Sequence, residues 1–208
     1  ERVVLYFLIV IVSYSVASAP LDFYRGFILP HRYSLSRQSL KSWLRDQAKG
    51  GILALTLGTA LVVVIYLFLE TFPQNWWLLA FTFMVLVTVV LTNLAPVLIL
   101  PLFFKTEPLA DQELRRRLIN LAQRAHTKIK DVFEIKLSAK TDAGNAMLMG
   151  WGNTRRIVIG DTMLRRYTPE EIEVVMAHEL GHHRHGDIVR QIAVQSPLML
   201  LGFYFMKL

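Results

Sequence analysis

The sequence contains no cysteine. Disulfide bonds, a thiolate nucleophile and thiolate metal ligands are therefore excluded, and redox chemistry gives no information about the compartment. Charged residues are also scarce, at 19% of the 208 residues, whereas 53% are hydrophobic and the mean hydropathy is +0.39. This balance is too apolar for an ordinary soluble domain and indicates a membrane protein.

Long apolar runs account for this composition. The candidate membrane spans are residues 3–19, 52–69, 76–104 and, as the start of a further helix, 191–208. Asn93, Pro96 and Pro101 interrupt the third run, so we expect it to kink or leave the bilayer there. Ala17-Ser18-Ala19 has the small residues of a signal-peptidase site, but Pro20 follows it and no basic leader precedes it, which favours a retained helix. Both chain ends lie in apolar runs, so we expect the sequence to be a fragment that lacks both flanks.

Basic residues predict the orientation in the membrane. Within a net charge of +7, residues 20–51 carry six lysine or arginine residues against two aspartates. The positive-inside rule places this segment of the transmembrane region, residues 1–104, in the cytosol as a partly helical loop. The polar portion, residues 105–190, lies on the same side, because two spans joined by a short turn bring the chain back. Since topology accounts for the basic residues, we expect the lipid bilayer as a partner and no nucleic acid.

The polar portion has the pattern of a small α+β unit. Asp111–His126 has the apolar spacing of an amphipathic helix, and its arginines at 115–117 predict a solvated or lipid-headgroup face. Strict alternation predicts a strand at Phe133–Leu137, and the apolar run Arg156–Ile159 after a turn at Gly150–Asn153 predicts a second. Both strands precede the motif that carries chemistry.

That motif is His178, Glu179 and His182, in the arrangement H-E-x-x-H. Residues four apart on an α-helix lie on one face, so the two imidazoles can share one metal ion. Neutral imidazoles suit zinc, and the glutamate beside the ion is placed to take a proton from a zinc-bound water. The alternative is two histidines that are merely packed or solvated.

The helix that carries the motif has its own start signals. Thr168-Pro169-Glu170-Glu171 predicts an N-cap, a proline at the first helical position and a capping-box glutamate. Apolar residues then recur at spacings of three and four, at Ile172, Val175, Met176 and Leu180. His183 and His185 lie off the ligand face, so we interpret both as surface residues.

Several further motifs precede this helix in a fixed order. They are the loop Leu29–Ser36 (LPHRYSLS), Asn145-Ala146-Met147 with Gly150, and Asn153–Thr162 (NTRRIVIGDT). Together with the H-E-x-x-H motif they resemble the integral-membrane CAAX prenyl protease 1 family of zinc metalloproteases, over nearly the whole chain. The resemblance implies a mainly α, polytopic helical membrane protein with a small α+β zinc-protease portion. It also implies an intramembrane chamber with the zinc site at its cytosolic side.

The resemblance also assigns site residues. It makes Asn145, Ala146 and Met147 the edge strand that pairs with the substrate backbone, the alternative being an ordinary hairpin strand. The family's third zinc ligand is a glutamate on a helix farther downstream than this chain reaches, so we expect the fragment itself to be inactive. The glutamates at 170–173 lie more than a turn before His178 and are not assigned to the metal, and Asp187 acts at most behind a ligand.

The favoured function is therefore a membrane-embedded zinc endopeptidase with Glu179 as general base and one zinc ion per site. Its expected substrate is a peptide or protein, prenylated or membrane-associated, and its expected location is a bacterial plasma membrane. Two alternatives stay open. One is an HtpX-like protease for quality control of membrane proteins, and the other is a non-catalytic membrane scaffold with a structural histidine pair.

Overall fold

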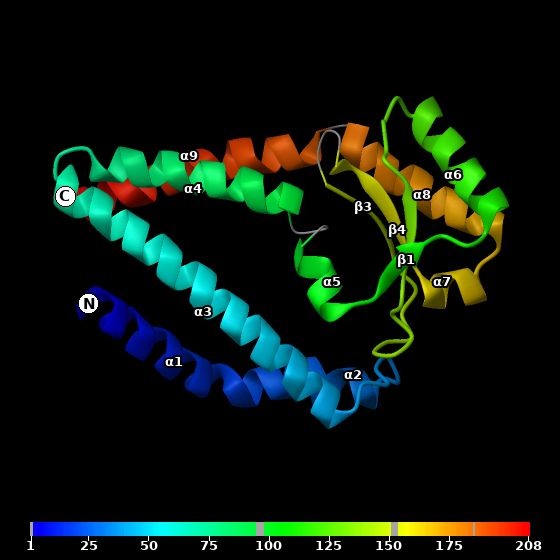
Figure 1. Ribbon diagram of the computed structural model, residues 1–208, viewed down its shortest axis with the longest axis horizontal. Helices are drawn as coiled ribbons and strands as arrows, with labels where there is room; N and C mark the ends of the chain where they lie inside the picture. Colours follow the sequence, from blue (N-terminus) through cyan, green and yellow to red (C-terminus); the bar gives the residue numbers. More distant parts are fainter. Residues whose placement is uncertain (1, 95–97, 151–153, 185) are drawn as a thin grey trace. The chain divides into compact units, whose positions relative to one another are not determined.

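The computed structural model describes residues 2–94, 98–150, 154–184 and 186–208 (Figure 1). The fold is mainly helical with a small sheet, as predicted, and the sheet has four strands. Two compact units are present, Glu1–Val85 with Ser196–Leu208, and Leu86–Gln195. The features predicted at Pro96, at residues 151–153 and at His185 lie outside the described residues.

The first unit is built from long apolar helices. Helix α1 (Arg2–Phe23) continues through the π-helical turn η1 (Tyr24–Ile28) into α2 (Leu29–Arg32). Helices α3 (Leu40–Thr71) and α4 (Trp76–Leu94) follow. Among the described residues, three helical segments are long and apolar enough to cross a membrane: Arg2–Arg32, Leu40–Thr71 and Trp76–Leu94. Within this unit α1 packs on α3.

The segment predicted as a partly helical loop, residues 20–51, is more helical than expected. Only residues 33–39 of it lie outside helices. Aromatic packing explains the extra helix, because Phe23 stacks on Phe27 at 5.3 Å and Trp43 meets both rings edge-on at 5.4 and 6.0 Å. These contacts hold the end of the first helical segment against the start of α3, so both helices extend beyond their predicted spans.

The third predicted span, residues 76–104, is helical to Leu94 and again at residues 98–103 among the described residues. Helix α4 ends at Leu94, and a separate short helix, α5 (Leu100–Phe103), precedes the sheet. At the end of α4, the Asn93 side chain donates a hydrogen bond to the carbonyl of Val89 at 2.9 Å. The final predicted span lies in helix α9 (Asp187–Lys207), whose last turns pack Phe203 against Trp76 at 6.2 Å.

The second unit contains the sheet, in the order β1-β2-β4-β3. Its strands are β1 (Thr106–Pro108), β2 (Val132–Ile135), β3 (Ala146–Met149) and β4 (Arg156–Gly160). Strands β2 and β4 are parallel and the other two pairs are antiparallel. Strands β2 and β4 were predicted, whereas β1, with three residues and a proline, is too short for alternation to reveal it.

The sheet packs against helices α6 (Gln112–Arg124), α7 (Asp161–Arg166) and α8 (Pro169–Arg184) (Figure 1). The core on their side includes Leu118, Ile157, Ile159, Ile172 and Met176, none more than 1% exposed. Each such side chain contributes about 1.5–3 kcal/mol when it leaves water. A second apolar cluster surrounds Ile135, Leu137 and Val158 and includes Phe104, Phe133, Met147 and Met149.

Candidate metal centre

Helix α8 begins as its sequence predicts. The backbone N–H of Thr168 donates to the Glu171 carboxylate at 2.8 Å, and the N–H of Glu171 donates to the Thr168 hydroxyl at 3.3 Å. This reciprocal pair is a capping box. Farther along, Ile172, Met176 and Leu180 are buried on one face. Cap and core together fix the rotation of α8 about its own axis.

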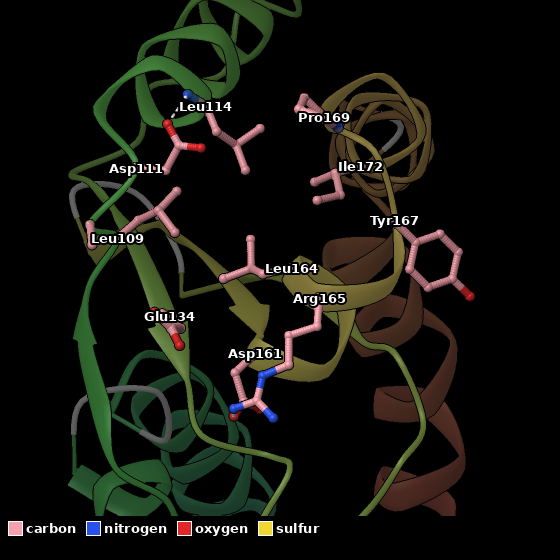
Figure 2. A pocket seen from close by; sticks show the side chains of 11 residues that line it. Leu109, Asp111, Leu114, Glu134, Asp161, Leu164, Arg165, Tyr167, Pro169 and Ile172 are labelled. Atoms are coloured by element: carbon pink, nitrogen blue, oxygen red, sulfur yellow. Dashed lines mark hydrogen bonds and ion pairs between the residues drawn. The ribbon is translucent and has the colours of Figure 1, made fainter.

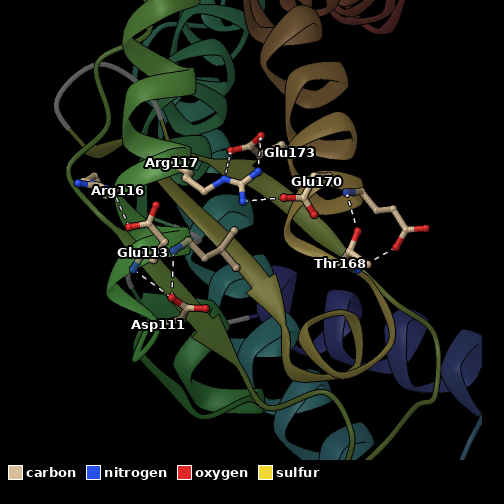
Figure 3. Close-up of polar contacts among 9 residues, drawn as sticks. Asp111, Glu113, Arg116, Arg117, Thr168, Glu170 and Glu173 are labelled. Carbon is tan, nitrogen blue, oxygen red and sulfur yellow. Dashed lines mark hydrogen bonds and ion pairs between the residues drawn. The ribbon is translucent and has the colours of Figure 1, made fainter.

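An arginine from α6 holds the first turns of α8 (Figure 3). The Nε and Nη2 atoms of Arg117 donate to the Glu173 carboxylate at 2.7 and 3.2 Å, and Nη1 donates to Glu170 at 2.8 Å. The hydrogen bond with Glu173, followed by that with Glu170, raises the pKa of Arg117, and the bond from Arg117 lowers the pKa of Glu170. These two carboxylates are thus engaged at the helix start, which supports leaving them out of the metal site.

The same contacts correct the prediction for the arginine run of α6. Arg115 donates from Nε to Asp131 at 2.7 Å, so both Arg115 and Arg117 pair within the protein instead of forming a headgroup face. Only Arg116 keeps the predicted exposure, with 70% of its side chain accessible while it pairs with Glu113. The run connects α6 to the loop before β2 and to α8.

The two motif histidines converge at the far end of α8. Their Nε2 atoms lie 3.1 Å apart, and their rings are nearly perpendicular with centroids separated by 4.7 Å. Two ligands at about 2.0–2.1 Å from a tetrahedral zinc ion stand roughly 3.3 Å apart. His178 and His182 therefore present their nitrogens at nearly the separation that zinc requires, and both side chains are exposed. Glu179 follows His178 directly and is half-buried.

Asp187, the first residue of α9, lies behind His182. Its Oδ2 atom is 2.8 Å from Nδ1 of His182. A carboxylate accepts there, so Nδ1 carries the hydrogen, and in the neutral imidazole Nε2, the atom facing His178, then keeps its lone pair. This is the protonation pattern of a metal ligand. From the sequence, Asp187 was expected to act at most behind a ligand, and His182 was not named as its partner.

A third ligand does not join this pair within the part of the chain that the structure describes. There, no group of three or more histidine, cysteine, aspartate or glutamate side chains is arranged to hold a metal. Chemically, two imidazole nitrogens with an adjacent carboxylate fit zinc, and a catalytic zinc site ordinarily takes three protein ligands.

The predicted substrate strand is the β3 edge of the sheet. Strand β3 pairs only with β4 among the described strands, and α8 packs against it. Ala146 begins the strand and is 7% exposed, Met147 follows it, and Asn145 directly precedes it. Leu148 and Met149 belong to the same strand and were not predicted, although the apolar run AMLM continues through them.

A cavity of about 290 Å³ lies elsewhere in this unit, and none of the predicted site residues lines it (Figure 2). Leu114, Leu164 and Ile172 point into it, with Asp161 and Arg165 below. The Asp161 carboxylate is already occupied by N–H groups of the loop after β2 and by the Ser138 hydroxyl. Burial raises the pKa of Asp161, but these hydrogen bonds outweigh it and lower the pKa overall. We therefore interpret Asp161 as a structural anchor.

Residues 2–105 match the family model described as the CAAX prenyl protease N-terminal region with five membrane helices, and residues 108–208 match the model of peptidase family M48. The chain belongs to peptidase family M48. This M48 chain is 32% identical to the metalloprotease YhfN of Bacillus subtilis, over 91% of the chain and 44% of YhfN. It is 30% identical to CAAX prenyl protease 1 of Saccharomyces cerevisiae, over 86% of the chain and 40% of that protein.

A solved structure shows the same fold. The crystal structure of S. mikatae Ste24p superimposes on the M48 chain with a TM-score of 0.89 at 27% identity, over 97% of this chain and 48% of that one. The chain spans less than half the length of these relatives. The predicted family and the predicted membrane-helical fold with a small sheet are thus confirmed.

Proposed function

We propose that the full-length protein is a membrane-embedded zinc endopeptidase in which His178 and His182 are two of the zinc ligands and Glu179 is the general base. The observation that carries this proposal is the 3.1 Å approach of the two Nε2 atoms on a capped, core-packed helix of an M48 chain. The carboxylate of Asp187 behind His182 also supports the proposal, because ligand histidines ordinarily donate their other ring N–H to such a group.

The residues of this chain have separate roles in the proposed reaction. The chemistry that zinc supplies when bound is Lewis acidity toward water and toward a peptide carbonyl. Glu179 stands next to His178 on α8 and takes the proton from the attacking water, then returns it to the leaving amine. Asp187 keeps His182 in the tautomer that leaves Nε2 free, so it orients a ligand and does not touch the substrate.

The substrate proposal follows from the sheet edge and from the relatives. An extended peptide adds to an open strand through main-chain hydrogen bonds, which favours the β3 segment with Asn145, Ala146 and Met147 as the substrate-binding strand. The relatives named CAAX prenyl protease 1 support a substrate at the membrane, prenylated or membrane-associated. We further propose a multi-pass protein of a bacterial plasma membrane with the site on the cytosolic side, as the basic segment at residues 20–51 favours.

The test is Glu179→Gln in the full-length protein, purified in detergent and assayed for cleavage of a peptide library. We expect cleavage to fall by about 10²- to 10⁴-fold while bound zinc is unchanged, because only the proton acceptor is lost. Glu107→Gln, on the exposed strand β1, is the matched control and should leave cleavage intact. Retained cleavage in Glu179→Gln would sink the proposal. Zinc absent from the wild-type protein would favour the scaffold alternative.

A further inference from the structure

The hydrogen-bond register of β3 shows which residues face its open edge. The N–H of Gly160 donates to the carbonyl of Asn145 at 2.7 Å. Hydrogen-bonded and non-hydrogen-bonded pairs alternate along an antiparallel ladder. The following pairs are Ala146 with Ile159, Met147 with Val158, Leu148 with Ile157 and Met149 with Arg156. Asn145, Met147 and Met149 thus direct their backbone groups to β4, and Ala146 and Leu148 direct theirs to the open edge.

The side chains of β3 divide between the two faces of the sheet. Ala146 and Leu148 belong to the core on the α8 side, which is the face of the histidine pair's helix. Met147 and Met149 belong to the cluster on the opposite face, which is built around Ile135, Leu137 and Val158. Both methionines are half-buried, so each keeps part of its surface accessible at the edge strand.

From this arrangement we propose that Met147 and Met149 form a specificity subsite for large apolar side chains of an extended substrate. The inference rests on the proposed function and names the class of substrate. A peptide paired with Ala146 and Leu148 alternates its side chains between the faces, so every second residue falls beside the methionines at a cross-strand distance of about 4.5–5.5 Å. The intervening residues face α8.

The chemistry of the subsite matches apolar side chains of varied shape. Methionine is flexible and polarisable, and it adapts to irregular apolar partners. A polar substrate side chain placed beside these groups would lose water without gaining a hydrogen bond from the two methionines. The subsite therefore selects Leu, Ile, Met or Phe over Ser at alternate positions.

The experiment maps cleavage sites in a synthetic dodecapeptide library by mass spectrometry, using the full-length protein. We expect the wild type to prefer large apolar residues over serine by about tenfold or more at one alternating set of positions. Met149→Ser and Met147→Ser should each reduce this ratio to roughly threefold or less. Met149→Leu, which keeps apolar volume, should preserve it. Preferences at the intervening positions should not change.

Unchanged preferences in the serine variants, or equal changes at both sets of positions, would overturn the subsite. Should the serine variants lose their zinc or their cooperative unfolding, Met149→Phe decides the matter, because filling the subsite should shift the preference toward Val and Ala. A wild type that cuts the library no better than Glu179→Gln would refute the proposed function and the subsite with it. A wild type that cuts, with selectivity insensitive to Met147 and Met149, refutes the subsite alone.

Discussion

Removing the carboxylate of Asp187 should weaken zinc binding without removing a ligand. The Oδ2–Nδ1 distance of 2.8 Å is that of a full hydrogen bond, and Asp187 is the partner that the structure gives to Nδ1 of His182. Loss of such a partner typically costs 10- to 100-fold in metal affinity, or about 1.4–2.7 kcal/mol. Asp187→Ala should fall in that range. Asp187→Asn should lose less, because its amide oxygen still accepts from Nδ1–H.

The assay is competition for zinc against a chelator of known affinity, on full-length protein in detergent, and it is independent of peptide cleavage. His182→Ala sets the scale for the loss of a whole ligand. Asp131→Ala is the matched control: this aspartate also has a side-chain partner, Arg115, but it lies away from α9 and should leave zinc affinity unchanged. Wild-type affinity in Asp187→Ala would refute the orienting role, and a loss as large as that of His182→Ala would make Asp187 a direct ligand.

Three further predictions concern the open edge of β3, the buried Asp161 and the membrane topology. Ala146→Pro removes an N–H at the open edge and should abolish peptide cleavage while unfolding is little changed, whereas Met147→Pro breaks the β3–β4 ladder and should lower the free energy of unfolding by about 1–3 kcal/mol in denaturant titrations. Asp161→Asn should destabilise by about 1.5–3 kcal/mol at neutral pH. The pKa of Asp161 is lowered on folding, so its contribution to the free energy of unfolding is complete above the ordinary carboxyl pKa of about 4 and is lost as pH falls below it. In thermal unfolding, the stability difference between mutant and wild type should therefore disappear in acid. A difference that stays constant with pH would contradict this. The chain lacks cysteine, so a single introduced cysteine reports on its own position. Gln74→Cys, in the turn between α3 and α4, should react with an impermeant maleimide in intact cells, whereas Arg116→Cys should react only after the membrane is broken. The reverse pattern would invert the proposed topology.

The parts of the structure that sequence predicted are those whose determinants are local. The cap at Thr168, the spacing of Ile172, Met176 and Leu180, and the histidines four apart all lie within one helix, so α8 could be placed without knowledge of its surroundings. Spans were likewise visible as runs of apolar residues. Their ends were not, because packing of Trp43 against aromatic residues of the preceding helical segment extends the helices into the predicted loop.

The remaining features depend on residues far apart in the chain. Arg117 and Glu173 are 56 positions apart, so the ion pair that holds α8 has no signature in either segment. The edge position of β3 depends on strand order, because β4 inserts between β2 and β3. Even with the strand in place, only its ladder register shows that Ala146 and Leu148, and not Asn145 or Met147, offer their backbone to the edge.

The two edge strands of the sheet differ in how well they are protected against pairing with another chain. Strand β1 carries Glu107 and ends in Pro108, and a charge or a proline on an outer strand discourages another chain from pairing with it. Strand β3, with the sequence AMLM, has neither device. An undefended apolar edge is an aggregation hazard that proteins otherwise remove. An open apolar edge is useful where the strand binds a peptide substrate. Overproduced protein should therefore self-associate through β3, and Leu148→Lys should suppress that association.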